Sequence, residues 1–214
     1  LPADQAQDML LVNKQLNDAA TQGHMDAQFF LAKMHDSNNG IGIYPDFTTA
    51  AKWYLEAAKQ GHAEAQSYRA IMCSQMGRWE EAYMWHLAAS EQDFTFSQGH
   101  LGDCYLFGRG VVGNSAEALR WYKIGSKKGN GDSSKMLAHM YDTGEGVEKD
   151  ETMAAHFYKL FIEQEGKYSH RSPHNILAHF RLGEMHSMGL GGCLKSAAKS
   201  TSYFKICATA GHSR

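Results

Sequence analysis

The stretch AATQGHMDAQ at residues 19–28 decides the fold, because it returns as AAKQGHAEAQ at residues 57–66. Seven of the ten positions are identical at an offset of 38 residues. Shorter copies of the same block stand at residues 125–130 and 208–212. Self-similarity at a near-constant period is the signature of a repeat protein. The chain is therefore predicted to be a tandem array of one structural unit.

Two further blocks recur in phase with the first one. An aromatic pair precedes each junction block: Trp53-Tyr54, Trp121-Tyr122, Phe157-Tyr158 and Tyr203-Phe204, with Trp85-His86 as a weaker copy. A third block surrounds a packing position, and its copies begin at Leu31, Arg69, Leu101, Leu137 and Leu182. The offsets between these copies are 38, 32, 36 and 45 residues, which is the range of paired-helix solenoids.

Each unit is predicted to hold two helices separated by a glycine break. In the fourth copy, residues 133–141 place apolar side chains one, four and five positions apart, which is the spacing of one helical face. Gly144 and Gly146 interrupt this pattern, because each glycine costs a helix interior roughly 1 kcal/mol. A second helical stretch follows at residues 151–163, and no segment of the sequence alternates for long enough to form a strand.

We therefore expect an all-α fold, an α/α right-handed superhelical solenoid of about five helix-pair repeats in a single domain over residues 1–214. A lone N-terminal helix is expected at residues 5–21. The repeats are expected at residues 25–61, 63–92, 95–129, 132–166 and 175–211. Because stacked helix pairs rotate slightly against one another, such an array is expected to present a concave face.

Composition and charge exclude several classes of function. The 21 Lys and Arg against 23 Asp and Glu give a net charge of -2, which offers no basic excess for a nucleic-acid backbone or an anionic membrane surface. No stretch approaches the roughly 20 apolar residues that a membrane-spanning helix needs. The four cysteines are too few and too scattered for a disulfide scaffold, and we expect them to be reduced and packed.

The recurring blocks resemble the Sel-one-like repeat (SLR), a relative of the tetratricopeptide repeat. The third copy carries that pattern best, with Leu101-Gly102, Tyr105, Gly108, Gly110-Val111, Ala118, Trp121-Tyr122 and Gly129. The fourth copy carries it from Leu137 to Gly166, whereas the glycine loop of the second copy has shrunk to residues 76–79. An insertion near residues 167–174 separates the fourth and fifth copies. The resemblance covers nearly the whole chain.

Other motifs have plainer interpretations within the repeat. Residues 108–113 match the G-x-G-x-x-G fingerprint of dinucleotide-binding proteins, but that fingerprint requires a preceding strand, and here a helix precedes it. Among the 12 histidines, His170, His174 and His179 invite a metal hypothesis, yet no acidic partner stands near them. We therefore expect no metal and no cofactor. No hydrolase motif is present, so a catalytic site assembled across repeats is the one enzymatic alternative.

The first helices of tetratricopeptide-like arrays line the concave face. If the packing leucines point into the core, the residues two positions later lie on the opposite face. These predicted partner-binding residues are Lys33, Ile71, Asp103, His139 and Glu184, joined on the same stripe by Phe29, Asp142 and Phe180. The mixture of charges and apolar groups suits a specific protein partner. The alternatives are a merely solvated face and a site on the ridge of glycine loops with the 167–174 insertion.

The sequence therefore predicts a non-catalytic protein-protein interaction module, a monomer or weak oligomer with no nucleic-acid partner and no membrane insertion. The resemblance implies three roles: a bacterial adaptor, an immunity protein that neutralises a secreted, lipase-type effector of type VI secretion, or a eukaryotic quality-control adaptor. The short array and the first residue, Leu1 rather than Met, favour the periplasm or cell envelope of a bacterium, with the cytoplasm as the alternative. No residue separates adaptor from immunity protein.

Overall fold

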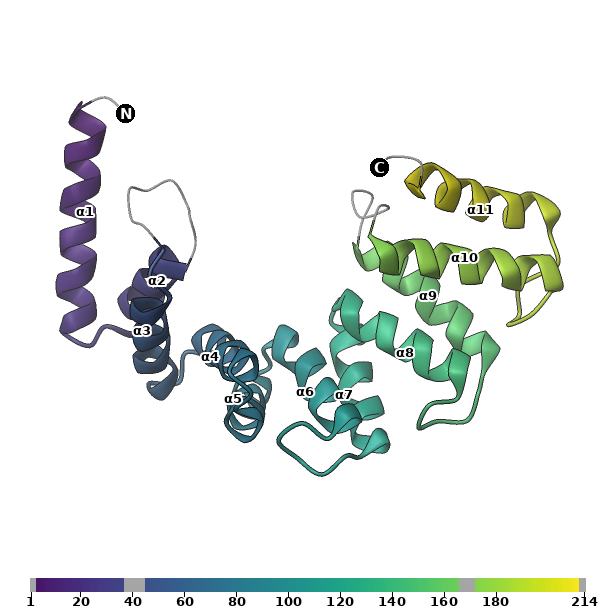
Figure 1. The fold of residues 1–214 in the computed structure, drawn as a ribbon, viewed down its shortest axis with the longest axis horizontal. Coiled ribbons are helices and arrows are strands. Elements are labelled where there is room, and N and C mark those ends of the chain that lie inside the picture. The colour runs from purple at the N-terminus through teal and green to yellow at the C-terminus, as the bar shows by residue number, and fades with distance from the viewer. Residues whose placement is uncertain (1–2, 37–44, 166–171, 212–214) are drawn as a thin grey trace. The chain divides into compact units, whose positions relative to one another are not determined.

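The computed structural model describes residues 3–36, 45–165 and 172–211, and every regular element within these ranges is a helix (Figure 1). The helices are α1 (Ala3–Thr21), α2 (Met25–Asp36), α3 (Phe47–Lys59), α4 (Ala63–Gln75), α5 (Trp79–Glu91), α6 (Thr95–Phe107), α7 (Ser115–Lys127), α8 (Gly131–Thr143), α9 (Glu151–Glu165), α10 (Pro173–Met188) and α11 (Ala197–Gly211). This architecture confirms the predicted all-α class. The chain forms two compact units, Leu1–Ser97 and Gln98–Arg214.

The helices follow the predicted phase, with α1 as the lone N-terminal helix and five pairs from α2–α3 to α10–α11. Three starts differ by one or two residues. Helix α1 begins at Ala3 rather than residue 5, α8 at Gly131 rather than residue 132, and α10 at Pro173, two residues before the expected start of the fifth repeat at residue 175. The Oγ of Ser172 accepts the N–H of Asn175 at 3.1 Å and so caps the helix early. Pro173 then occupies the first turn, where its missing N–H leaves no bond unmade. Most of the predicted insertion, residues 167–171, lies outside the described residues.

The junction block AAKQGHAEAQ at residues 57–66 contains three residues, identical in the block at residues 19–28, whose structural roles are clear. Gly61 follows α3 with a φ of 98°, in the left-handed region that glycine adopts without strain. His62 then caps α4, because its Nδ1 accepts the N–H of Ala65 at 3.2 Å. Gln66 in α4 donates from Nε2 to the carbonyl of Ala58 at 3.2 Å. One short block thus ends a helix, starts the next and ties the two together.

The block at residues 19–28 repeats this arrangement in the preceding repeat. Gly23 has a φ of 93°, and Gln28 donates from Nε2 to the carbonyl of Ala20 at 3.0 Å. Gln60 of the following junction donates in turn to Oε1 of Gln28 at 2.7 Å. The fourth residue of one block, Gln60, therefore hydrogen-bonds to the tenth residue of the preceding block, Gln28, and links successive junctions.

The glycine loops inside the repeats of the second unit also share one structure. In each of them, a backbone N–H near the end of the loop donates to a carbonyl near the end of the first helix. The three bonds are Asn114 to Tyr105, Asp150 to Tyr141 and Ser196 to His186, all at 2.9 Å. The G-x-G-x-x-G stretch is therefore a repeat loop between α6 and α7, as the sequence predicted.

The core of the second unit lies between the helices of each pair and between adjacent pairs. The packing residues Leu101, Leu137 and Leu182 are completely buried. The glycine that follows the first of them is required by close packing, because a Cβ at Gly102 would lie 2.5 Å from the ring of Tyr122. The second helix of the repeat can therefore press its tyrosine against the first helix.

The first unit is built around Tyr54 of α3, which is completely buried and stacks on Tyr68 of α4 with ring centroids 4.9 Å apart. Its second repeat departs at the packing position, where Arg69 replaces leucine and is only 7% exposed. Arg69 donates from Nη2 to Oε1 of Glu81 in α5 at 2.9 Å. A charged pair therefore joins the two helices where other repeats use an apolar contact.

Candidate partner-binding surface

The predicted stripe of partner-binding residues is divided between the two units. Lys33 in α2 and Ile71 in α4 belong to the first unit. Asp103 in α6, His139 in α8 and Glu184 in α10 belong to the second. Each unit therefore presents its own part of the stripe, and the second unit holds the larger part.

In the first unit the stripe is largely occupied by internal contacts. Lys33 Nζ lies 3.6 Å from Oε1 of Glu64 in the next repeat and 5.3 Å from the ring centroid of Phe29. Ile71 is half-buried. The expectation that Phe29 is exposed was wrong: Phe29 is 4% exposed, because its ring stacks on His62 with centroids 4.2 Å apart. The residue that caps α4 thus covers the aromatic ring of α2.

In the second unit the first helices of the three pairs, α6, α8 and α10, follow one another (Figure 1), and each contacts the next. Gly99 of α6 faces α8, since a Cβ at this position would lie 3.0 Å from Oγ of Ser133. Arg181 of α10 donates from Nε to Oδ2 of Asp142 in α8 at 2.8 Å. Asp103, His139 and Glu184 therefore lie on adjacent helices.

Asp103 and His139 have partly exposed side chains that are held in place by neighbours. Tyr122 donates its hydroxyl to Oδ1 of Asp103 at 2.6 Å, and His100 Nδ1 lies 3.5 Å from Oδ2. Burial, followed by the charge of Asp103, raises the pKa of Tyr122, so the phenol stays a donor. The Nε2 of His139 lies 3.4 Å from Oε2 of Glu145, and about half of the histidine side chain is exposed. Both stripe residues can present a polar group to a partner.

Asp142 corrects the sequence analysis, which placed it on the exposed stripe. Its side chain is only 7% exposed. Tyr158 donates its hydroxyl to Oδ2 at 3.0 Å, and Arg181 donates to both carboxylate oxygens. Burial opposes the charged form, but the hydrogen bonds from Arg181 and Tyr158 still hold the pKa of Asp142 below its ordinary value. Asp142 therefore connects α8, α9 and α10 rather than meeting a partner.

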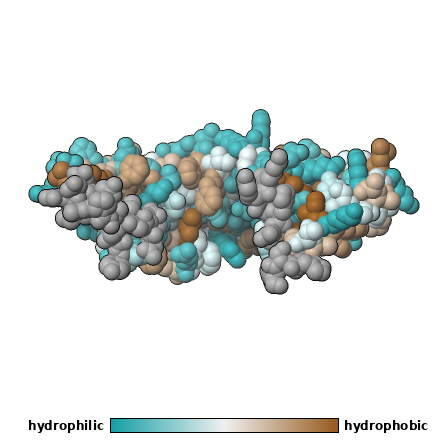
Figure 2. All heavy atoms as spheres, turned by 90° about the horizontal axis from the view of Figure 1, so that it is seen from above, coloured by the Kyte–Doolittle hydropathy of each residue, from teal (hydrophilic) through white to brown (hydrophobic). Residues whose placement is uncertain are grey.

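The exposed face of α10 carries more apolar surface than the sequence analysis assigned to it. Phe180 is 43% exposed, as expected, and Leu177 and Met188 are 51% and 56% exposed. With Glu184, these residues lie three, four and four positions apart, so they share one helical face. The sequence analysis assigned to the stripe only the positions two before, two after and five after the packing leucine, whereas Leu177 and Met188 lie five before and six after Leu182. On the face seen in Figure 2, hydrophobic side chains form separate patches among hydrophilic ones.

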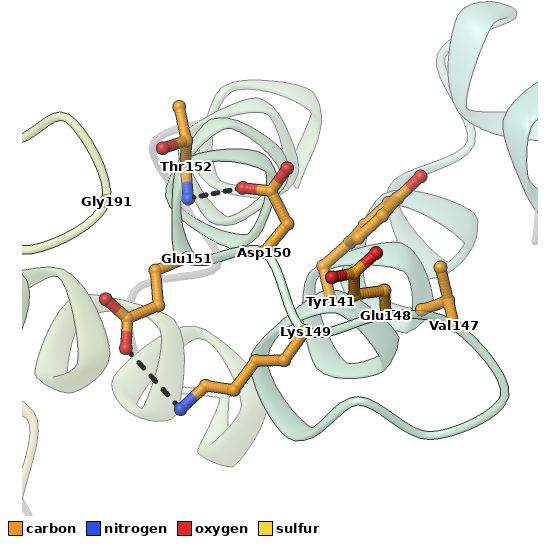
Figure 3. Close-up of a pocket in the computed structure, with 8 residues that line it drawn as sticks. All are labelled: Tyr141, Val147, Glu148, Lys149, Asp150, Glu151, Thr152 and Gly191. Atoms are coloured by element: carbon orange, nitrogen blue, oxygen red, sulfur yellow. Dashed lines mark hydrogen bonds and ion pairs between the residues drawn. The ribbon is translucent and has the colours of Figure 1, made fainter.

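The ridge of glycine loops, the second candidate surface, holds a pocket of about 710 Å³ in the second unit (Figure 3). The loop between α8 and α9 and the loop between α10 and α11 supply most of its lining, which consists of Tyr141, Val147, Glu148, Lys149, Asp150, Glu151, Thr152 and Gly191. Lys149 Nζ lies 3.4 Å from Oε1 of Glu151, and Asp150 accepts the N–H of Thr152 at 2.9 Å. Three carboxylates against one ammonium suit a cationic group better than an anionic one.

The histidines and cysteines form no metal-binding cluster within the described ranges. No three His, Cys, Asp or Glu side chains lie together there as a metal-binding group. His179 Nδ1 is bonded to the carbonyl of Asn175 at 2.8 Å, and His170 lies outside the described residues. All four cysteines are free thiols, and burial raises the pKa of Cys73 and of Cys104 to about 11. None of the described helices is both long and apolar enough to cross a membrane.

Comparison with known proteins agrees with the repeat phase. The model of the Sel1 repeat matches residues 26–62, 96–130, 132–165 and 176–212. These segments coincide with the first, third, fourth and fifth repeats and leave out the second, whose glycine loop is shortened. A curated relative, DAP3-binding cell death enhancer 1 of Rattus norvegicus, is 32% identical over 102 residues, which is 46% of this chain and 20% of that protein. The chain thus spans about a fifth of the length of the curated relatives it matches.

Three solved structures extend the likeness over most of the chain. The protective antigen c5321 of uropathogenic Escherichia coli, which displays an SLR fold, is 28% identical with a TM-score of 0.80, over 92% of this chain and 40% of that one. A Sel1 repeat protein from Oxalobacter formigenes is also 28% identical, with a TM-score of 0.74, over 92% of this chain and 76% of that one. The immunity protein Pa5087 of Pseudomonas aeruginosa is 17% identical with a TM-score of 0.55, over 91% and 72%, a likeness in fold alone.

The Sel1 matches cover well over half of the sequence, and each of them coincides with one capped helix pair of the structure. The two neighbours at 28% identity carry the same repeat. The chain therefore belongs to the Sel1 repeat family, an all-helical solenoid fold for protein interactions.

Proposed function

We propose that this chain is a non-catalytic module that binds a specific protein partner on its first helices, with α10 as the main anchor. The apolar stripe of α10 carries the proposal. Leu177, Phe180 and Met188 expose about half of their surface on a helix whose other face is packed against its own unit. Because transfer of apolar surface out of water stabilises a complex by roughly 25 cal/mol per Å², aligned side chains of this size favour a protein partner.

The polar residues of the stripe act around this anchor. Asp103 supplies a carboxylate that Tyr122 holds in position, and His139 supplies an imidazole that is half exposed. Lys33 and Ile71 are proposed as contacts within the first unit alone, apart from the α10 anchor. Binding energy usually concentrates in a few residues, and the exposed apolar side chains of α10 assign most of it to α10 and its neighbour α8.

The partner is either a component of a bacterial envelope complex, for which this chain is an adaptor, or a secreted lipase-type effector that this chain neutralises. The likeness to two bacterial proteins at 28% identity supports a bacterial protein. The likeness in fold to an immunity protein supports the second role less strongly. A phospholipase or secretion-spike gene beside the gene for this chain, whose purified product binds the chain directly, would select the immunity role.

The proposal is tested by affinity capture from the envelope fraction of the source cell, with the captured protein then purified and its affinity measured. The double variant Leu177→Ser/Met188→Ser should lose the partner. The matched control Val112→Ser/Leu194→Ser, which changes side chains that are 87% and 83% exposed elsewhere in the same unit, should retain it. If only Glu148→Lys abolishes binding, the site is the loop pocket rather than α10. Equal binding by all variants would refute both surfaces.

A further inference from the structure

The charged groups around Arg181 do not balance. Its guanidinium donates from Nε and Nη2 to the two oxygens of Asp142, at 2.8 and 2.5 Å. It also donates from Nη1 to Oε2 of Glu184 at 2.6 Å. Lys149 is the other cation whose charge acts on Asp142, but its Nζ is paired with Oε1 of Glu151 at 3.4 Å. Asp142 and Glu184 therefore share Arg181, and the group carries one negative charge in excess.

The excess charge is accessible at Glu184 rather than at Asp142. The Asp142 side chain is 7% exposed and accepts three hydrogen bonds, including one from the hydroxyl of Tyr158 at 3.0 Å. The Glu184 side chain is 28% exposed, and within the described ranges its Oε1 accepts no hydrogen bond. Because Arg181 is already engaged by Asp142, Glu184 is held in one orientation without being fully neutralised.

Glu184 also stands in the middle of the apolar stripe. Phe180 lies four residues before it and Met188 four residues after it, which corresponds to about 6 Å along the axis on either side. Leu177 extends the stripe by a further turn. A helix laid along α10 would meet an apolar contact, a carboxylate and a second apolar contact in that order.

We propose that Glu184 is a specificity-determining residue that recognises a Lys or Arg side chain on an amphipathic helix of the partner, with apolar residues about one turn to either side of that cation. This inference rests on the proposed function, because it names the chemistry of the partner at the α10 anchor. Charge complementarity selects this occupant, since a cation opposite Glu184 balances the three charged groups of the site.

A second copy of this chain fits the stripe poorly. Symmetric pairing places the same surface on both sides of an interface, so it would bring one Glu184 toward the other within an apolar contact. Such juxtaposed like charges oppose association. The partner is therefore a different protein.

The test uses a displayed library of helical peptides with randomised positions, selected against the intact chain. Peptides that depend on Leu177 and Met188 should be enriched in Lys or Arg flanked by apolar residues at a spacing of about four. Glu184→Gln should weaken the selected peptides roughly fivefold, and raised salt should weaken them as well. Selection against Glu184→Lys should enrich Asp or Glu at the same position. The matched control is Glu163→Gln, an exposed carboxylate of α9 outside the stripe.

Two failures are distinguishable. If the selected peptides need Leu177 and Met188 but bind Glu184→Gln as tightly as the original chain, the inference about Glu184 is wrong and the α10 anchor stands. If no selected peptide depends on Leu177 and Met188, both the inference and the anchor are wrong. Circular dichroism of each variant establishes that the helices are intact in either case.

Discussion

The second and fourth repeats form the same helix pair, but the packing position between the helices holds a charged residue in the second and an apolar residue in the fourth. In the fourth, Leu137 packs between α8 and α9 and is completely buried. In the second, Arg69 occupies the same position, and its side chain is 9% exposed against Glu81 of α5. The loop between the helices is also reduced, from seven residues after α8 to three after α4. The Sel1 matches include the fourth repeat and leave out the second.

This difference shows which parts of the repeat determine its geometry. The junction that caps the first helix is present in both repeats, through His62 at α4 and Asn130 at α8. The packing residue between the helices is replaceable, and its replacement has a cost. Among the described residues, Nε of Arg69 finds no hydrogen-bond partner although it is buried. A buried donor without a partner costs about 1–3 kcal/mol.

The largest expected effect is the loss of the apolar contact in the fourth repeat. Leu137→Ala should lower the free energy of unfolding by about 2–5 kcal/mol, because it removes a completely buried side chain and leaves a cavity. Urea denaturation measures this change. Hydrogen exchange should show the greatest loss of protection in α7 to α10, since each repeat touches only its neighbours. Uniform loss along the whole chain would contradict this view of independent repeats.

The charged pair of the second repeat should respond differently to single and double changes. Glu81→Gln should cost about 1–3 kcal/mol, because it leaves the buried guanidinium of Arg69 without its countercharge. The double variant Arg69→Leu/Glu81→Gln should be at least as stable as the original chain, since it restores the packing residue of the other repeats. Urea unfolding of the original chain, the single variants Arg69→Leu and Glu81→Gln, and the double variant gives the coupling between the two residues. If the double variant is less stable than Glu81→Gln, the Arg69–Glu81 pair is needed to hold together the two helices that the short loop connects.

Most of the fold was predictable from the sequence, because the repeat phase marks every helix pair and a G-H or G-N dipeptide marks the junctions before α2, α4 and α8. Before α6 the glycine is absent, and Asp93 adopts the left-handed conformation with a φ of 70°. The site was less predictable. Phe29 and Asp142 lie at stripe positions by register, but other side chains cover them. His62 of the next repeat stacks on Phe29, and Asp142 is covered by Arg181 of the next repeat together with Tyr158 of its own repeat. Such contacts depend on which long side chains happen to reach across from the next repeat. Periodicity within one helix carries no information about them.

Acid should weaken the fourth repeat through Asp142, whose pKa is held below the ordinary value near 3.8 by Arg181 and Tyr158 against the effect of burial. A lowered folded-state pKa stabilises the protein fully above the unfolded value, and the contribution is lost as the pH falls through the folded one. Urea unfolding between pH 6 and pH 2.5 should therefore show a loss of stability below about pH 4. Asp142→Asn should be less stable at pH 6 and should lose less stability on acidification. If the free energy of unfolding falls in parallel with pH for the two proteins, Asp142 does not cause the loss of stability in acid.

The smallest expected effect compares two asparagines at one position of the fourth and fifth repeats, each seven residues before the packing leucine. Asn130 caps α8, since its Oδ1 accepts the N–H of Ser133 at 2.7 Å, and Asn130→Ala should cost about 1 kcal/mol. Asn175 has lost that role to Ser172, and its amide is completely buried with no partner for either atom among the described residues. Asn175→Leu exchanges this unpaired amide for an apolar group of similar shape, so it should change stability by less than about 0.5 kcal/mol or raise it. Urea denaturation of both variants measures the difference. If Asn175→Leu costs as much as Asn130→Ala, then Asn175 still stabilises the start of α10, and the early cap at Ser172 has not replaced it.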